Sequence, residues 1–323
     1  MGSAVLFRAI QLAWLPIALV GYVLILVRML VFARESGTSA TTLASLYTRW
    51  MQHRLGTRPD VPCARLMAVL PGASRVGLTL TTGGTMLGHR ITGYVQRLYR
   101  YPYPGVPPMI HQSAARTTFF DTALHRHLAE VDQLVVLGAG YDTRAFRIPD
   151  HIRCFELDQP DTQRTKRNLL ARTGLDMHRV TFVPANFRTD DWLANLTAAG
   201  FDPRRPAFFL WEAVTMYLDR RSVEETLRAI AGTAPGSVVA FDYFNAALIA
   251  SKDPVMRYAR AMVQLTREPF MFGLDLPPPA RSQVERFLTP LGLTLTEHRT
   301  FGRETPTQPV AAGFATAVVR AGP

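Results

Sequence analysis

The feature that most constrains the fold is an alternation of short apolar segments and amphipathic segments through the second half of the chain. The strand-like segments are Gln133–Leu137, Ile152–Leu157, Val180–Pro184, Ala207–Trp211 and Ser237–Phe244. The helix-like segments are Ser113–Val131, Thr162–Thr173, Asp191–Ala199, Ser222–Gly232 and Pro254–Thr266. Short apolar strands that alternate with helices form parallel sheets covered on both faces. We therefore predict an α/β fold with a doubly wound, mostly parallel sheet.

The flanking segments are less regular. After the alternation we expect a helix at Arg281–Leu291 and two strands, Leu293–Glu297 and Gly313–Arg320. These strands lack a crossover helix, which favours an antiparallel pair at the sheet edge. Before the alternation, the patterns predict a helix at Thr41–Leu55, a short helix within residues 59–71, a strand at Val76–Leu80 and a loop at Tyr101–Pro108. The expected units are an N-terminal apolar helix (1–36), a helical and loop cap (37–112) and a ligand-binding domain (113–323).

The N-terminal unit contains an apolar run, Ile10–Val27, with no charged residue over 18 positions. At about 1.5 Å per residue this run measures about 27 Å, close to the thickness of a thin hydrocarbon core. The arginine excess lies C-terminal to the run, which would place the main body in the cytoplasm. A membrane anchor is the favoured interpretation. A helix that packs on the domain or lies in the membrane interface is the alternative, and Pro16 favours it.

The positive charge is confined to the N-terminal third. Residues 1–120 contain 12 arginines and only two acids, Glu35 and Asp60, whereas the remainder is nearly neutral. No DNA-binding motif accompanies these arginines, so we expect no nucleic-acid partner and favour an anionic membrane surface. Two cysteines exclude a disulfide scaffold and a multi-cysteine metal site, and we expect no metal.

A glycine turn and an acid mark the expected ligand site. Gly138 and Gly140 follow the first strand, and Asp158 ends the second strand twenty residues after Gly138. The third glycine of a dinucleotide fingerprint would stand at Thr143, so the fingerprint fails. A nucleoside cofactor without a diphosphate fits this turn better than a dinucleotide does, and S-adenosyl-L-methionine is the commonest cofactor of that kind. The alternatives are an NAD(P)-dependent oxidoreductase with a degenerate fingerprint and a non-catalytic, membrane-tethered nucleoside-binding module.

Several blocks resemble the leucine carboxyl methyltransferase-like family, a branch of the Rossmann-like class I S-adenosylmethionine-dependent methyltransferases. The resemblance runs from about Thr42 to the C-terminus. The blocks are Val135–Arg147, Cys154–Leu170, Ala115–Thr117 with Phe120–Asp121, Phe182–Arg188 and Trp211–Leu218. Their order along the chain makes the resemblance far more specific than a glycine turn alone.

The resemblance implies roles for individual residues in binding S-adenosyl-L-methionine. Arg116 would pair with the methionine carboxylate, and Glu212 would contact the amino end. Gly138 and Gly140 would pass under the methionine moiety, and Asp158 would hold the ribose hydroxyls. Opposite charges at the two ends suit a cofactor with one carboxylate and one ammonium group.

Two points stay open in this assignment. Relatives usually carry Asp-Leu after the third strand, where this chain has Asn186 and Phe187. The asparagine oxygen could accept from the adenine amino group, and the phenyl ring could cover the adenine. Glu156 shares a strand face with Asp158, so either carboxylate could reach the ribose.

The expected reaction is the methylation of a carboxylate or hydroxyl oxygen on a hydrophobic small molecule near a membrane. An ionised carboxylate needs no general base, whereas a hydroxyl acceptor would benefit from one. His89, His111 and Tyr217 are candidates for that role, but each is better explained as structural or surface, and we name no catalytic residue. The segments Gly83–Pro108 and Met256–Phe272 are rich in aromatic residues and methionine. They could line an apolar acceptor pocket or simply belong to the core.

Overall fold

The computed structural model describes residues 2–36, 42–252, 256–257, 260–261, 269–305 and 309–320. Its centre is a seven-stranded sheet in the order β3-β2-β1-β4-β5-β7-β6. The strands are β1 (Gln133–Leu137), β2 (Arg153–Asp158), β3 (Val180–Pro184), β4 (Ala207–Trp211), β5 (Val238–Phe244), β6 (Leu293–Thr300) and β7 (Ala312–Val319). Strands β1 to β5 run parallel, while β7 lies antiparallel between β5 and β6. The predicted mostly parallel sheet with an antiparallel edge pair is confirmed.

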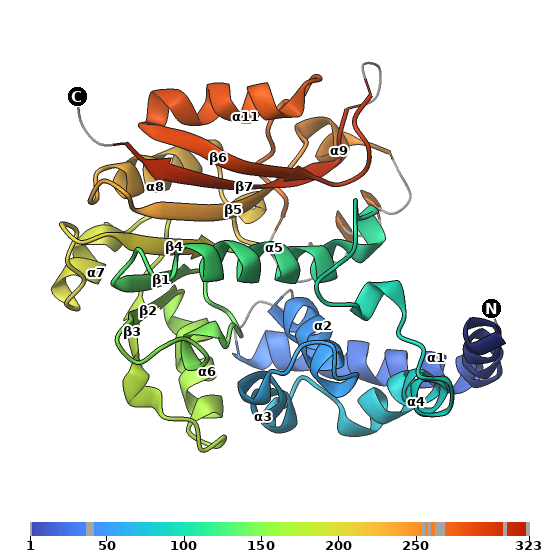
Figure 1. Ribbon diagram of the computed structural model, residues 1–323. Helices are drawn as coiled ribbons and strands as arrows, with labels where there is room; N and C mark the ends of the chain where they lie inside the picture. The colour runs from blue at the N-terminus through green and yellow to red at the C-terminus, as the bar shows by residue number, and fades with distance from the viewer. Residues whose placement is uncertain are drawn as a thin grey trace.

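Helices cover both faces of this sheet (Figure 1). They are α5 (Gln112–His127), α6 (Pro160–Leu170), α7 (Trp192–Ala198), α8 (Arg220–Ala231), α9 (Ala246–Ala250) and α11 (Ala280–Leu288). Alternate residues of β1 enter different cores: Leu134 and Val136 pack with α5, whereas Val135 and Leu137 pack on the opposite face. This alternation explains why all five strand residues are buried. Most of the predicted helix Pro254–Thr266, including Met262, lies outside the described residues.

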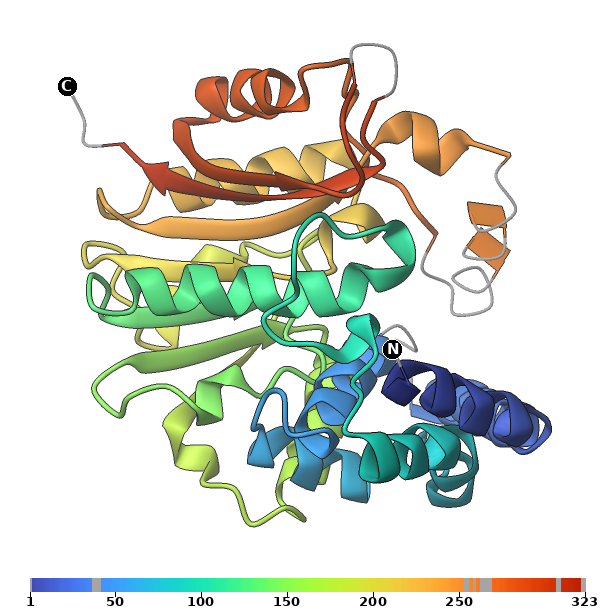
Figure 2. The same cartoon turned by 45° about the vertical axis from the view of Figure 1, so that its right-hand side comes forward.

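The N-terminal part is helical and lies beside the sheet (Figure 2). It comprises α1 (Gly2–Ser36), α2 (Thr42–Arg54), α3 (Val61–Val69) and α4 (Arg75–Thr92). A third core cluster joins α2 and α3 to α6, with Leu46, Met51, Leu66 and Leu170 among its buried members. The helices expected at Thr41–Leu55 and within 59–71 are therefore confirmed.

The strand predicted at Val76–Leu80 is wrong, because these residues belong to α4. The serine side chain of Ser74 caps the helix by accepting from the Gly77 N–H, and Gly93 ends it at φ 66°. Threonine hydroxyls along α4 donate to carbonyls one turn earlier, as Thr82 does to Leu78. Packing against α1 overrides the strand preference of valine and threonine, since the glycines of α4 face that helix.

Candidate functional site

The glycine turn after β1 is held in a conformation that favours glycine. Gly138 and Gly140 adopt φ angles of 64° and 43°. A Cβ atom on Gly138 would lie 2.4 Å from the Cγ2 atom of Val214, a residue of the loop after β4. The turn and the β4 loop are therefore in direct contact, and only glycine fits between them.

Asp158, rather than Glu156, lies against this turn. The Gly140 N–H donates to Asp158 Oδ2 at 2.6 Å, and the Gln159 N–H donates to Oδ1 at 2.7 Å. Each carboxylate oxygen keeps a second lone pair for a further donor. Burial raises the pKa of Asp158, and the two backbone N–H groups oppose that shift.

Glu156 is committed to an interior ion pair. Its Oε2 atom lies 2.6 Å from the Lys166 Nζ atom, and both side chains are almost fully buried. Burial raises the pKa of Glu156 to about 7, although Lys166 acts in the opposite direction. Of the two carboxylates on this face of β2, Asp158 is the one placed at the glycine turn.

Glu212 follows β4 and faces an arginine that sequence reasoning missed. Its Oε2 atom lies 2.6 Å from Arg144 Nη1, four residues after Gly140. Its Oε1 atom is buried and has no hydrogen-bond partner within the described part of the chain. A buried carboxylate oxygen without a partner is costly unless another donor reaches it.

Arg116 is engaged by Asp242, a residue of β5. The Arg116 Nε atom lies 2.9 Å from Asp242 Oδ2, and the Ala213 N–H donates to Asp242 Oδ1 at 2.8 Å. Ala213 follows Glu212 directly and adopts a left-handed φ of 61°, which is uncommon for a residue other than glycine. Asp242 thus connects the arginine of α5 with the loop that carries Glu212.

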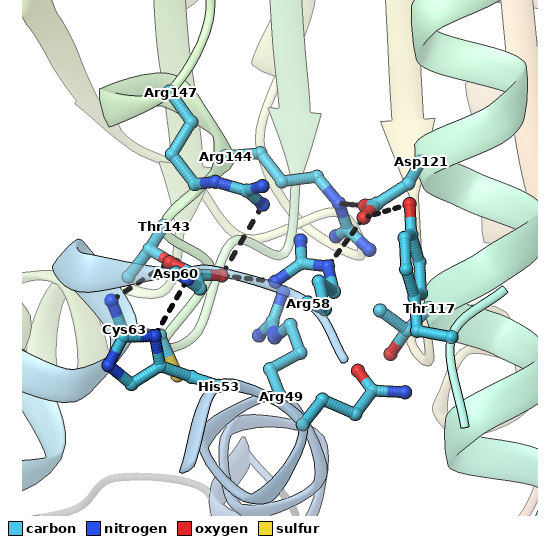
Figure 3. A network of polar contacts seen from close by, with 12 residues as sticks. Arg49, His53, Arg58, Asp60, Cys63, Thr117, Asp121, Thr143, Arg144 and Arg147 are labelled. Carbon is cyan, nitrogen blue, oxygen red and sulfur yellow. Dashed lines mark hydrogen bonds and ion pairs between the residues drawn. The ribbon is translucent and has the colours of Figure 1, made fainter. Parts of the chain in front are cut away.

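A layer of buried ion pairs joins this site to the N-terminal helices (Figure 3). The layer contains five arginines and five carboxylates, including the pairs of Glu212 and Asp242 described above. The arginines are Arg49, Arg58, Arg116, Arg144 and Arg147, and the carboxylates are Asp60, Asp121, Asp142, Glu212 and Asp242. Asp121 accepts from Arg58 Nε and Arg144 Nε, each at 2.6 Å. Burial raises the pKa of Asp121, but Arg144 and Arg58 outweigh it and hold that pKa well below its usual range.

This ion-pair layer fixes α2 and the segment before α3 over the carboxyl end of the sheet. Arg49 of α2 pairs with Asp142 at 2.8 Å, and Arg58 pairs with both Asp60 and Asp121. Tyr101 of the predicted loop also donates to Asp121, at 3.1 Å. The cap is therefore attached to the same loop that carries the glycine turn.

Asn186 and Phe187 are placed differently from the other predicted residues. The Asn186 side-chain oxygen accepts from the Arg188 N–H at 3.0 Å, and Asp190 accepts from the Asn186 N–H. Phe187 packs near Trp192 and Trp211, with ring centroids 6.1 and 6.4 Å away. Both residues thus make local contacts.

The two apolar segments have partly structural roles. Tyr99 and Tyr103 are buried, and Tyr217 stacks on Phe270 with ring centroids 5.7 Å apart. His111 lies 2.8 Å from the Tyr103 hydroxyl. Among the residues that the structure describes, no group of three or more His, Cys, Asp or Glu side chains could hold a metal ion.

Sequence reasoning missed Asp242, Arg144 and the arginines of the cap. Arg144 stands inside the block Val135–Arg147, four residues beyond the second glycine, and its charge is the available signal. Asp242 carried a signal as well, since it is the lone acid in an apolar strand. A buried acid in a strand needs a cationic partner, and nothing in the sequence identified Arg116 as that partner.

The sequence of this chain is similar to those of several known proteins. Residues 97–231 match the leucine carboxyl methyltransferase family. A relative from Mycolicibacterium gilvum, named "Putative S-adenosyl-L-methionine-dependent methyltransferase", is 37% identical over 179 residues, which cover 53% of this chain and 55% of the relative. A relative of the same name from Mycolicibacterium vanbaalenii is 35% identical over 204 residues, covering 59% and 64%. The chain thus spans less than two thirds of the length of these curated relatives.

A solved structure from Thermobifida fusca, described as a "putative methyltransferase", is also similar. It has 17% sequence identity and a TM-score of 0.49, and the alignment covers 81% of this chain and 94% of that chain. The region matched by the family, residues 97–231, includes the glycine turn, Asp158 and Glu212.

Proposed function

We propose that this chain is a class I S-adenosylmethionine-dependent methyltransferase of the leucine carboxyl methyltransferase-like family, whose match covers residues 97–231, and that it methylates an oxygen of a hydrophobic small molecule near a membrane. S-adenosyl-L-methionine is the cofactor. The observation that carries the proposal is the contact between the glycine turn and Asp158, since Gly140 N–H donates to that carboxylate at 2.6 Å within the matched region.

The residues present fit this cofactor. The unpartnered Glu212 Oε1 can accept from the ammonium group, and Asp158 retains lone pairs for the ribose hydroxyls. Arg116 would hold the carboxylate, with its guanidinium oriented by Asp242. Gly138 and Gly140 would pass under the methionine moiety, in a turn that their positive φ angles shape. Asn186 and Phe187 would have to leave their local contacts to meet the adenine.

The chemistry assigned to this chain is mainly binding and alignment. When bound, the cofactor supplies an electrophilic methyl group. The protein must hold the acceptor oxygen in line with it, with the reacting atoms about 3–3.5 Å apart. An acceptor carboxylate is already ionised at neutral pH, so no side chain has to remove a proton. The cap fixed by Arg49 and Arg58 would exclude water from this edge.

The membrane part of the proposal depends on α1. Residues 2–32 form the single helix, among those described, that is long and apolar enough to cross a membrane. An enzyme held at a membrane by this helix would meet acids or alcohols that dissolve in lipid. We also propose that residues 1–36, 37–112 and 113–323 act as anchor, cap and cofactor-binding domain.

The test uses the full-length protein purified in detergent. Calorimetric titration with S-adenosyl-L-methionine should show binding, and titration with NAD should show none. Transfer of a labelled methyl group is then measured with a lipid extract and with an extract of water-soluble metabolites as acceptors. In the lipid extract, the label should stay on the product after a treatment that removes non-covalently bound S-adenosyl-L-methionine. Binding of NAD alone would overturn the methyltransferase assignment. Transfer confined to water-soluble acceptors would overturn the hydrophobic substrate class.

A further inference from the structure

The helices α1 and α4, which we call the α1–α4 pair, show an apolar outer surface. Leu12 is 70% exposed and Val5 is 64% exposed, and exposed apolar side chains recur along α1 from Val5 to Val31. The large exposed apolar residues of the pair are Val5, Leu6, Leu12, Leu15, Ile17, Leu19, Val20, Tyr22, Val23, Leu24, Val27, Val31, Val76, Leu87 and Ile91. Contiguous apolar surface of this kind marks a protein or membrane contact.

Several uncharged polar side chains of the pair form hydrogen bonds on its inner side. Gln11 donates to the Thr85 hydroxyl at 3.0 Å and accepts from Gln96 at 2.8 Å. The Trp14 indole N–H donates to the Leu80 carbonyl at 2.8 Å. Such an arrangement, with hydrogen bonds inside and aliphatic side chains outside, is the reverse of a helix pair in water and suits a hydrocarbon surrounding.

Glycines form the contact between the two helices. A Cβ on Gly21 would lie 2.6 Å from the Thr81 N atom, and one on Gly84 would lie 2.7 Å from the Trp14 Cβ. Gly77 meets the Gly21 carbonyl in the same way, and Gly88 meets the Phe7 ring. Close backbone approach through small residues spaced along a helix is the packing mode of membrane helices, where dispersion rather than burial from water drives association.

The chain is tied to the same core cluster near the start of α4 and again just after α4 ends. Ala73 and Leu78, at the start of α4, belong to the third core cluster, and Tyr99, just after its end, belongs to the same cluster. Because α4 is attached at both ends, it cannot stand upright across a bilayer. Its uncharged stretch, residues 76–88, measures about 20 Å, which is shorter than a hydrocarbon core.

Arginines surround the apolar surface at both ends. Arg8 and Arg90 are exposed near the end where Phe7 meets Gly88, and Arg28 and Arg75 are exposed near the opposite end. A groove of about 390 Å³ opens between the helices, lined by Arg8, Gln11, Leu12, Trp14, Leu15 and Thr85, among others. The two ends of the pair carry the charge that attracts anionic headgroups.

We propose that the α1–α4 pair is an in-plane membrane-binding element that inserts its apolar face into one leaflet of an anionic phospholipid bilayer, with both helices on the same side of the membrane. This deepens the membrane part of the proposed function and is independent of the methyl-transfer part. Elements that lie in the membrane interface bury apolar side chains at the boundary between headgroups and acyl chains and use basic residues for anionic lipids.

The first test measures flotation of the full-length protein with vesicles of phosphatidylcholine alone or mixed with phosphatidylglycerol. Wild-type protein should float with the mixed vesicles, and salt should weaken the binding. The variant Leu12→Glu/Val20→Glu/Val27→Glu changes only outward-facing residues and should lose at least tenfold in vesicle affinity. The matched control, Val106→Glu/Ile110→Glu, changes exposed apolar residues outside the pair and should bind as wild type does.

The arginines give a second, graded readout. Arg8→Gln and Arg90→Gln should each lower affinity for the mixed vesicles roughly fivefold and leave binding to phosphatidylcholine unchanged. Affinity for S-adenosyl-L-methionine should not change in any of these variants, because the site lies on other elements. If the wild-type protein binds vesicles but does not bind S-adenosyl-L-methionine, the proposed function is refuted and this inference still holds.

A third test separates an in-plane pair from a spanning helix. Ser3→Cys and the exposed Asp150→Cys, each in a Cys63→Ala/Cys154→Ala background, are reconstituted with vesicles and treated with an impermeant maleimide. Equal labelling of both sites supports the proposal. Protection of Ser3→Cys alone would show that α1 crosses the membrane. Three other results would overturn the proposal. The triple glutamate variant could bind vesicles as wild type does, or the wild-type protein could be a dimer that these glutamates dissociate. The protein isolated from cells could also lack residues 1–36.

Discussion

The ion-pair layer at the sheet edge and the α1–α4 pair both place polar groups inside the molecule, but with opposite surroundings. In the ion-pair layer, full charges are buried and paired, as Arg144 is with Asp121 and Glu212. In the α1–α4 pair, neutral groups such as Gln11 and Thr85 form hydrogen bonds between the helices, and many of the exposed side chains are aliphatic. The first region has the pairing that buried charges require, and the second has the arrangement that the proposed lipid contact would use.

Because their surroundings differ, the two regions should respond differently to substitution. Removing one member of a buried ion pair leaves an uncompensated charge in a medium of low polarity, so the loss is large. Enlarging a glycine in the helix contact changes only packing, so the loss is moderate. Changing a side chain at the cofactor edge should affect binding and leave the fold intact.

The largest effect is expected for Arg144→Ala. This substitution leaves Asp121, Asp142 and Glu212 without their shared cation and should lower the free energy of unfolding by about 3–5 kcal/mol. Urea titration followed by intrinsic fluorescence measures the change. Arg221→Ala, which removes an exposed pair with Glu225, is the control and should leave the midpoint where it is. A midpoint for Arg144→Ala equal to that of wild type would show that the layer does not stabilise the fold.

A smaller effect is expected for Gly84→Leu. The added side chain would meet Trp14 and push α1 away from α4, at a cost of about 1–3 kcal/mol. Limited proteolysis should then cut α1 faster than in wild-type protein. Thr79→Leu, on the exposed side of α4, is the control. If both variants are cut at the wild-type rate, the glycines do not determine the contact between the helices.

The sequence predicted one of these regions far better than the other. Strands β1, β3 and β4 were predicted with their observed bounds, because five-residue apolar runs between helices leave few alternatives. The pairing of α1 with α4 was not foreseen. Valine and threonine at residues 76–82 indicated a strand, and the glycines there have meaning only once a second helix lies against them.

The candidate site was predicted in outline. The glycines and Asp158 follow from strand order, since neighbouring carboxyl ends meet at one edge. The choice between Glu156 and Asp158 depended on Lys166, whose position in α6 no alternation pattern reveals. The link from Arg116 to Asp242 joins residues 126 positions apart, so only the folded chain shows it.

Cofactor affinity should change when the Asp158 carboxylate is removed. In Asp158→Ala, the loss of two hydrogen bonds to a charged group should cost about 1–3 kcal/mol of binding free energy, a five- to 150-fold weaker affinity. Isothermal titration with S-adenosyl-L-methionine provides the measurement. Asp161→Ala, an exposed acid three residues later, should bind the cofactor normally. Unchanged affinity in Asp158→Ala would assign the ribose to another group.

The smallest effect is expected from replacing the interior pair as a unit, in Glu156→Gln/Lys166→Met. A buried ion pair can often be exchanged for neutral groups of similar size at little cost in stability. The pH dependence should change more clearly. Burial raises the pKa of Glu156 from 4.5 to about 7, so between these values the folded state binds more protons than the unfolded state. The contribution of Glu156 to stability is therefore present below pH 4.5 and is lost as pH rises towards 7.

Other groups act over the same pH interval, so the two proteins must be compared by difference. Burial lowers the pKa of His298 from 6.5 to about 4, which raises stability with increasing pH over that range. His298 is present in both proteins, and its contribution cancels when the unfolding free energy of the double variant is subtracted from that of wild type. The remaining difference should fall from pH 4.5 to 7, because only the wild type must ionise a buried carboxyl group. A flat difference would mean that the pair keeps its charge throughout and that Lys166, rather than burial, controls Glu156.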